Sequence, residues 1–423
     1  TLPGGGASAR RAAFCPSRRL ICKPRLVQRR MGGEGKRART DGPQGRFIYV
    51  GSTTAGQAAV KDSPAFGKIT VKSAGQGINI FRVGEDGHSL VPAGFFASGC
   101  YCGWLAPHPS NGHLYAAGSD GRVHALKVGA DGTLSPVGSA DSLGKSAYVE
   151  LSRDGRWALV ANYATGYIAV LPIHPDGQIG EATDSKLHGM TPKPSLADRQ
   201  EACHPHQIRL DPKTGRWALV CDLGADRVFV YAFDAESGAL AGAANSRRHL
   251  VLPEGAGPRH LDFHPSQPWV YVLCELDGNI VVCDWDSKDG HLSTKQSIYV
   301  LPEGVVCCRA HHAGNAHILV SADGRTVYAS SRTDNQIVVF RVDATSGMLS
   351  KTQSVPSGGV CPRNFHLDYS LEQPRIRITN QDSQNVTSYA INPGDGTLCE
   401  PPSIISLDGV CPPVIVGPVG NSL

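Results

Sequence analysis

No stretch of this sequence reaches the ~18 consecutive apolar residues that a membrane-spanning helix needs, so we expect no membrane segment. None of the 13 cysteines forms a CxxC pair, and their odd number favours free thiols in a reducing compartment over a disulfide framework. A GxSxG elbow, a glycine-rich phosphate loop and a dinucleotide fingerprint are missing as well. The absence of these three motifs argues against the enzyme classes that carry them.

Charge is also scarce, because charged residues make up 18% of the chain and the formal net charge is +4. Much of the excess lies in residues 1–45, where Thr1 to Gly33 contains many arginines and no acidic residue. We predict that 1–45 is a disordered basic leader. It resembles an organelle transit peptide, and the duller alternative is upstream sequence before a start at Met31. The remaining body is near neutral, which argues against a nucleic-acid-binding surface.

The chain does contain an internal repeat. A turn of the pattern apolar–x–x–(Asp/Ser)–Gly–x–(Leu/Ile) recurs seven times, with successive turns 45 to 61 residues apart. Its glycines are Gly87, Gly132, Gly177, Gly238, Gly290, Gly347 and Gly396. Each turn follows two short alternating runs, such as RWALVAN and GYIAVLPI, and six copies keep a third run upstream. Alternation bounded by Gly, Asp and Asn is the pattern of β-strands.

The repeat predicts an all-β fold, a seven-bladed β-propeller that occupies residues 46–423 as one domain. Four short strands per unit at this spacing are typical of propeller blades. The first copy lacks its upstream strand, and the run Val410–Val416 lies beyond the seventh copy. We therefore expect the C-terminal strand to close the first blade. A sandwich plus a separate β domain is the alternative, but it leaves seven matched units unexplained.

Aligning the copies reveals two sets of residues at equivalent positions. One set ends the second strand of each copy: Thr53, Ser119, Asn162, Asp222, Glu275, Arg332 and Asn380. The other set opens the upstream strand: Gly103, Ala147, His206, Arg259, Ala316 and Arg363. Equivalent positions in a radial array lie on one circle, so each set is expected to form a ring. A proline precedes three members of the second set and restricts the backbone there.

The two rings bring together arginines, histidines and a glutamate. Arg259, Arg332 and Arg363 would repel one another in a shared pocket unless an anion or a carboxylate lies between them. Glu275 would balance part of this charge, and His206 can carry a proton near neutral pH. The rings therefore predict acid–base chemistry on a small anionic molecule.

A metal site is not expected. His311, His312 and His317 have a metal-like composition, but no carboxylate or thiol stands at a matching spacing. We predict neither a metal nor another cofactor.

At these residues the chain resembles the seven-bladed propeller lactonases. This family includes bacterial-type 6-phosphogluconolactonases and fungal 3-carboxy-cis,cis-muconate lactonising enzymes. The matching stretches, which occur in the family's order, are Val149–Tyr163, Arg199–Gln207, Gly257–His260 with Tyr271–Glu275, Ser321–Arg332 and Pro362–Phe365. The chain departs from the family pattern in the second blade, where Cys102-Gly-Trp-Leu105 and Ser119-Asp120 stand.

The resemblance implies a catalytic set that coincides with the rings, namely His206, Arg259, Glu275 and Arg332. We expect Glu275 or His206 to activate water, and Arg259 and Arg332 to stabilise the oxyanion. The residues expected to bind substrate are His204, Arg363, Asp222 and Asn162.

The favoured function is hydrolysis of 6-phosphogluconolactone in the pentose phosphate pathway. A muconate-type cycloisomerase and a non-enzymatic binding scaffold are the alternatives. The partner is expected to be a small anionic substrate, with no nucleic acid and no membrane, and the oligomeric state stays open. The location is expected to be cytoplasmic, or a plastid or mitochondrion if the leader is a transit peptide.

Overall fold

The computed structural model describes residues 46–54, 77–87, 89–190, 198–242, 248–310, 314–407, 410–412 and 414–419. These residues belong to one compact unit, Pro43–Leu423. The predicted leader, residues 1–45, lies outside them, and so do His311 and His312. Within the described ranges, no helix is long and apolar enough to cross a membrane.

The described strands form seven sheets, which are the blades. The first contains β1 (Phe47–Thr54), β2 (Gly77–Val83), β3 (Leu90–Ala97), β29 (Val410–Cys411) and β30 (Ile415–Val419). The second contains β4 (Cys102–Pro107), β5 (His113–Gly118), β6 (Arg122–Val128) and β7 (Leu134–Asp141). The third contains β8 (Ser146–Leu151), β9 (Trp157–Asn162), β10 (Tyr167–Pro172) and β11 (Asp184–Leu187).

The fourth blade contains β12 (Pro205–Leu210), β13 (Trp217–Asp222), β14 (Arg227–Asp234), β15 (Ala239–Ala241) and β16 (Leu250–Val251). The fifth contains β17 (Pro258–Phe263), β18 (Trp269–Cys274), β19 (Asn279–Asp286) and β20 (His291–Tyr299). The sixth contains β21 (Asn315–Val320), β22 (Thr326–Ser331), β23 (Gln336–Val342) and β24 (Leu349–Pro356). The seventh contains β25 (Pro362–Asp368), β26 (Arg375–Asn380), β27 (Asn385–Ile391) and β28 (Leu398–Ser406).

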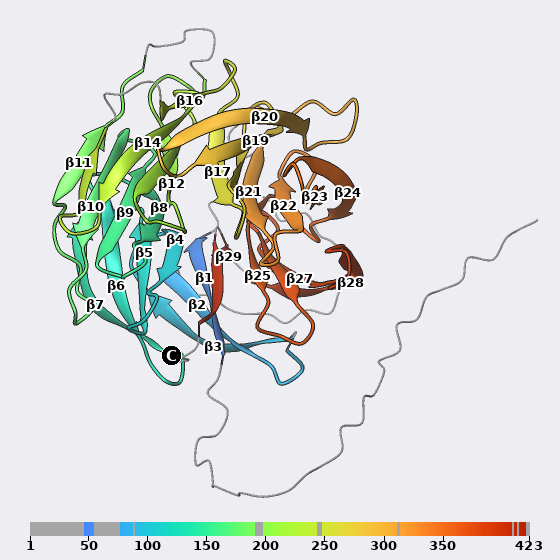
Figure 1. The fold of residues 1–423 in the computed structure, drawn as a ribbon. Helices are drawn as coiled ribbons and strands as arrows, with labels where there is room; N and C mark the ends of the chain where they lie inside the picture. Colours follow the sequence, from blue (N-terminus) through green and yellow to red (C-terminus); the bar gives the residue numbers. More distant parts are fainter. Residues whose placement is uncertain are drawn as a thin grey trace, which may run out of the picture. The chain divides into compact units, whose positions relative to one another are not determined.

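The first strand of each blade from the second to the seventh lies on the inside of the ring (Figure 1). The inner strands β4, β8, β12, β17, β21 and β25 contact one another in that order, and β30 contacts both β25 and β4. In the first blade β30 pairs antiparallel with β1. The C-terminal strand therefore closes the first blade, which confirms the sequence-based prediction.

The repeated turn glycines explain why the blades follow one another so regularly. At Gly132, Gly238 and Gly347 the backbone φ is positive, a conformation that glycine adopts without strain. A Cβ at Gly132 would lie 2.3 Å from the ring of Phe47 in the preceding blade. The carbonyl of the same glycine accepts a hydrogen bond from Tyr49 Oη at 3.0 Å. The turn thus joins each blade to the blade before it, which requires glycine at the repeat position.

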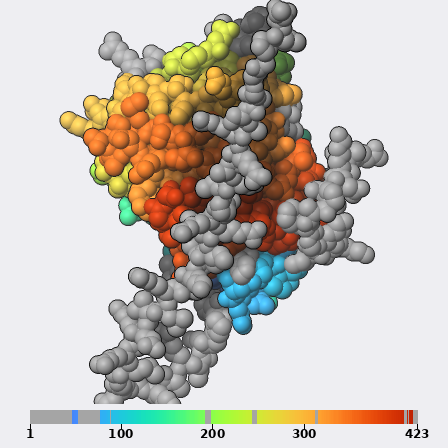
Figure 2. All heavy atoms as spheres, turned by 90° about the vertical axis from the view of Figure 1, so that its right-hand side faces the viewer, coloured from blue at the N-terminus to red at the C-terminus, as the bar shows by residue number. Residues whose placement is uncertain are grey.

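The seventh blade meets the first in the same way. Arg377 Nη2 donates to the carbonyl of Gly87 at 3.2 Å, and Arg46 Nη1 donates to Ser370 Oγ at 2.8 Å. In the space-filling view, residues of the first blade (blue) lie beside the seventh (red), next to the fifth and sixth (yellow to orange) (Figure 2). The two ends of the repeat therefore pack against each other.

Candidate active site

A β-bulge stands at the start of every inner strand from the second to the seventh blade. The strand register shifts between Cys102 and Trp104, Ser146 and Tyr148, Pro205 and Gln207, Pro258 and His260, Asn315 and Ile318, and Pro362 and Asn364. At each shift, at least one residue of the inner strand is skipped in the pairing with the neighbouring strand. These skipped residues include all six of the set that opens the upstream strand, from Gly103 to Arg363. A bulged residue is unpaired in the ladder and its side chain is re-aimed. The bulges therefore create the predicted ring.

Glu275 directly follows β18 and receives three guanidinium groups. Its Oε1 lies 2.6 Å from Arg199 Nη2 and 3.1 Å from Arg332 Nη2. Its Oε2 lies 2.9 Å from Arg259 Nε. All four side chains are at least nine-tenths buried. Arg259, Glu275 and Arg332 are therefore in direct contact, as a single catalytic site requires.

The arginines decide the protonation state of the glutamate. Burial alone raises the pKa of Glu275, but Arg332, Arg259 and Arg199 together lower that pKa well below its usual value. The side chain is thus a carboxylate across the physiological pH range. Because both of its oxygens face guanidinium groups, it is a weak base.

The arginines are also held by backbone carbonyls. Arg332 Nε donates to the Gly314 carbonyl at 2.8 Å, and Arg259 Nη1 donates to the Ala316 carbonyl. A Cβ at Gly314 would lie 1.9 Å from the carbonyl oxygen of Glu275, so only glycine fits there. These contacts fix the guanidinium planes before any substrate arrives.

Arg199 was missed when the sequence was searched for catalytic residues. It lies between β11 and β12 and donates to the carbonyl of Arg309 at 2.9 Å as well as to Glu275. The available signal was its position at the start of the matched stretch Arg199–Gln207. It escaped notice because it belongs to neither aligned set and reaches the site from a loop.

His206 lies beside this cluster on β12. Its ring makes edge contacts with Tyr163 at 5.5 Å and with His260 at 5.0 Å between centroids. The Nδ1 atom is buried without a hydrogen-bond partner. Burial, reinforced by Arg259, holds the pKa of His206 well below its usual value, so the imidazole is neutral at pH 7. It can therefore accept a proton.

Three residues that were expected to bind substrate have internal partners. The backbone N–H of His204 and that of Ala225 donate to Asp222 Oδ1 at 2.8 and 3.0 Å, and His188 Nδ1 lies 2.6 Å from Asp222 Oδ2. His204 Nδ1 contacts the carbonyl of Tyr163 at 2.8 Å.

Asn162 is the third residue that was expected to bind substrate and has internal partners instead. Ser146 Oγ donates to Asn162 Oδ1 at 2.9 Å, and Asn162 Nδ2 donates to the carbonyl of Ser142. Asn162 and Asp222 are fully buried. Both side chains connect the start of their blade's inner strand to the end of the second strand.

Arg363, the fourth of the expected substrate-binding residues, is half-buried on β25. Burial lowers its pKa, but Tyr101, Cys361 and Glu275 outweigh burial and raise it. It therefore adds a further positive charge beside the Arg199–Arg259–Arg332 group.

An aromatic layer closes the axis beneath the site. Trp104 contacts Tyr148, His260 and His317, with ring centroids 4.1, 5.5 and 5.6 Å apart. His260 Nε2 lies 3.3 Å from Arg259 Nη1, and its Nδ1 lies 2.7 Å from Nδ1 of His317. Burial holds the pKa of both histidines well below its usual value. His317, one of the histidines whose composition is metal-like, is thus a neutral member of this layer.

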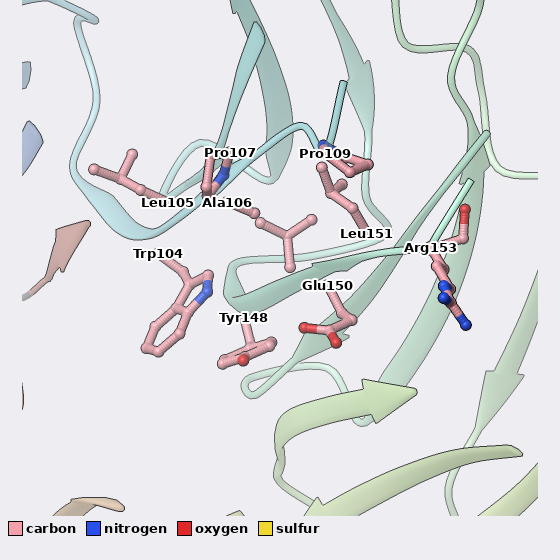
Figure 3. Close-up of a pocket in the computed structure, with 11 residues that line it drawn as sticks. Trp104, Leu105, Ala106, Pro107, Pro109, Tyr148, Glu150, Leu151 and Arg153 are labelled. Atoms are coloured by element: carbon pink, nitrogen blue, oxygen red, sulfur yellow. The ribbon is translucent and has the colours of Figure 1, made fainter. Parts of the chain in front are cut away.

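A second polar group lies two residues further along the inner strands. Arg209 lies 3.4 Å from Glu150 and 3.2 Å from Asp262. A cavity of about 340 Å³ between β4 and β8 lies beside it. Figure 3 shows Trp104, Tyr148 and Glu150 side by side and pointing the same way. The cavity is lined by Leu105, Pro107, Leu151 and their neighbours and does not include Glu275.

Residues 47–409 match the model of the family described as "Lactonase, 7-bladed beta-propeller". The chain belongs to this family. It is 30% identical over 291 residues to the 6-phosphogluconolactonase of Erwinia tasmaniensis. The aligned stretch covers 69% of this chain and 80% of that protein. The chain is also 28% identical over 261 residues to the 6-phosphogluconolactonase of Bacillus subtilis, 62% of this chain and 70% of that one.

A solved structure supports the same placement within the lactonase family. The periplasmic gluconolactonase of Pseudomonas aeruginosa superposes with a TM-score of 0.73 at 25% identity, covering 88% of this chain and 98% of that one. The family resemblance stated from sequence motifs is therefore confirmed, and so is the lactonase class.

Proposed function

We propose that this protein hydrolyses 6-phosphogluconolactone to 6-phosphogluconate, a step of the pentose phosphate pathway. The observation that carries the proposal is a neutral, buried histidine beside guanidinium groups held by one carboxylate. The relatives named 6-phosphogluconolactonase support the choice of substrate. The alternative of a pure binding scaffold loses support, because Arg259, Glu275 and Arg332 lie in contact.

We assign the general base to His206. It takes a proton from water while the water oxygen attacks the lactone carbonyl carbon. Arg259 and Arg332 stabilise the oxyanion that forms on the carbonyl oxygen. The ring C–O bond then breaks, and protonated His206 returns its proton to the alkoxide oxygen. Neutral His206 is thus regenerated, one water is consumed, and the product carboxyl releases its proton to solvent.

Glu275 receives a different role from the one that sequence left open. Both of its carboxylate oxygens are engaged by arginines, whereas Nδ1 of His206 has no hydrogen-bond partner, so geometry favours the histidine as the base. Glu275 instead counterbalances the arginines so that they can lie close together without substrate. We class it as a positioning residue for Arg259 and Arg332.

Arg363 is the phosphate-binding residue in this proposal, because its forked guanidinium suits a phosphate group and its positive charge persists at all physiological pH values. His204, Asp222 and Asn162 hold the inner strands in place. The substrate is then a small anion, and the reaction requires neither nucleic acid nor membrane. We expect it to occur in the cytoplasm, or in an organelle if the leader targets one.

The test is hydrolysis of freshly made 6-phosphogluconolactone by the full chain, measured as acid release above the spontaneous rate. Rapid turnover that disappears in His206→Asn supports the proposal. Turnover equal to the spontaneous rate would refute it. 3-Carboxy-cis,cis-muconate, assayed in parallel, distinguishes the cycloisomerase alternative.

A further inference from the structure

A group of metal-type donors lies in the second blade, outside the arginine site. Cys100 Sγ lies 3.5 Å from His124 Nε2, and the same nitrogen lies 2.9 Å from Asp120 Oδ2. One donor atom from each of the three residues can be chosen so that all lie within 4.8 Å of one another. The donors of a tetrahedral zinc ion, bound at ~2.0–2.3 Å, stand roughly 3.2–3.8 Å apart. The group therefore needs only small shifts to surround an ion.

The group supplies three donors. The thiol of Cys102, two residues further along, contacts Ser98 Oγ at 3.5 Å and does not belong to the group. One thiol, one imidazole and one carboxylate make a set of three, and water can take the fourth position of a tetrahedral ion. Soft thiolates with imidazole select zinc over magnesium or calcium, which prefer oxygen ligands.

The backbone around the group is shaped for close approach of its side chains. A Cβ at Gly118 would lie 2.2 Å from Asp120 Oδ1 and 3.0 Å from His124 Nε2, so glycine leaves the room that both side chains occupy. Asp120 Oδ1 accepts the backbone N–H of Arg122 at 3.2 Å, which orients the carboxylate with Oδ2 toward the histidine. Such outer contacts are typical of metal ligands.

Burial shows how an ion would enter the group. Cys100 is 4% exposed, whereas the side chains of His124 and Asp120 are 20% and 36% exposed. The thiol thus lies on the closed side of the group, while the imidazole and carboxylate leave a path from solvent. A metal ion can reach the group without opening the fold.

We propose that Cys100, Asp120 and His124 bind one zinc ion, with water as the fourth ligand. The Cys100 thiol binds as a thiolate and releases one proton to solvent as the Zn–S bond forms. The ion joins the segment before β4, which holds Cys100, to Asp120 in the turn between β5 and β6 and to His124 on β6. Asp120 stands where the second blade departs from the family pattern.

The proposed ion also has a structural consequence for the arginine site. Tyr101 lies between the two cysteines, and its backbone N–H and C=O are both paired with Ser119, at 3.1 and 2.8 Å. Of the groups that raise the pKa of Arg363, Tyr101 is the strongest. Zinc would therefore fix the segment that holds Tyr101 near Arg363. The ion lies outside the arginine site, and the hydrolytic chemistry does not pass through it.

The experiment is zinc stoichiometry of the full chain, purified under reducing conditions with zinc and then freed of excess metal. We expect about one zinc per chain, released by a chelator, and less than about a tenth of that in Cys100→Ser and in His124→Ala. Cys399→Ser and His291→Ala, which alter exposed residues elsewhere, should retain the full content. Circular dichroism confirms that each variant folds.

Cobalt substitution identifies the ligands directly. Co²⁺ in the wild-type protein should give thiolate-to-cobalt charge-transfer absorption and the visible bands of tetrahedral cobalt, and Cys100→Ser should abolish the charge-transfer band. Wild-type protein without bound zinc would overturn the proposal. So would zinc that is unaffected by the Cys100 and His124 substitutions, or a disulfide between Cys100 and Cys102 that persists under reducing conditions.

Discussion

Arg199 and Glu275 are 76 residues apart in the chain, yet Arg199 Nη2 donates to Glu275 Oε1 at 2.6 Å. The arginine comes from a loop that precedes the fourth blade, and the glutamate directly follows β18, the second strand of the fifth. This pair supplies the third guanidinium that lets Glu275 stay ionised in a buried position.

The first prediction concerns that pair. Replacing Arg199 with Ala removes a charge-assisted hydrogen bond to Glu275, which keeps Arg259 and Arg332 as partners. We expect a loss of about 1.5–3 kcal/mol in the free energy of unfolding, measured by chemical denaturation. Arg216→Ala, which removes an exposed arginine, should change it by less than about 0.5 kcal/mol. Equal effects of the two substitutions would show that the Arg199–Glu275 contact has no stabilising role.

The second prediction concerns the general base. His206→Asn removes the proton acceptor and should lower kcat for the lactone by about 10²–10⁴-fold, with a smaller change in KM. The exposed His291→Asn serves as the control and should keep wild-type kinetics. If His206→Asn retains wild-type kcat, another group activates water.

The third prediction separates phosphate binding from ring opening. Arg363→Ala should raise KM for the phosphorylated lactone by roughly 10–100-fold, because a hydrogen bond to a charged group contributes about 1.5–3 kcal/mol. The unphosphorylated gluconolactone lacks that group, so its kcat/KM should change little. Equal losses for both substrates would mean that Arg363 does not bind phosphate.

The fourth prediction follows from the buried histidines. His206, His260 and His317 have pKa values well below the unfolded value of about 6.5, so below pH 6.5 the unfolded chain binds protons that the folded chain does not. Stability is therefore present in full above pH 6.5 and declines as pH falls, by up to about 1.4 kcal/mol per pH unit for each histidine.

Denaturation curves between pH 7.5 and about pH 5 measure this decline. His317→Asn keeps a polar group against His260 but removes one titrating site, so the slope of stability against pH should fall by up to about 1.4 kcal/mol per pH unit. An unchanged slope in this variant would contradict the neutral state of His317.

The fifth prediction concerns closure of the ring. Ending the chain at Leu407 removes β29 and β30, and with them the buried side chains of Val414 and Ile415, each contributing about 1.5–3 kcal/mol. We expect the truncated protein to unfold at a much lower denaturant concentration or to remain unfolded. The double substitution Val414→Ala with Ile415→Ala keeps the backbone pairing to β1 and should cost less. Equal midpoints for truncated and full chains would rule out closure by the last strand.

Much of the fold could be predicted because it is a repeat. The glycine turns recur at positions where the next blade must approach a side chain of the previous one, as Gly132 approaches Phe47. The alternation of apolar and polar residues indicated the strands. The missing upstream strand of the first copy indicated that the C-terminal strand closes the first blade. The division at residue 45 and the disordered leader stay predictions, since residues 1–45 lie outside the described part of the chain.

The site was only partly predictable. His206, Arg259 and Arg363 were found because a bulge occurs at one position of each inner strand, and a position that repeats can be read by alignment. Arg199 comes from a loop with no counterpart in the other copies. The cysteine–histidine group was also missed, because the pairing of β5 with both β4 and β6 brings Cys100 near Asp120 and His124 across a spacing that matches no common metal motif.

The sequence by itself determined the number of blades, the closing strand and the two circles of aligned residues, because these depend on periodicity alone. Only the tertiary structure decided what each polar residue does. Asp222 and Glu275 occupy the same place in their repeats, but Asp222 meets backbone N–H groups and a histidine, while Glu275 meets three guanidinium groups. Their roles differ because the partners come from other blades and loops, and local sequence carries no record of them.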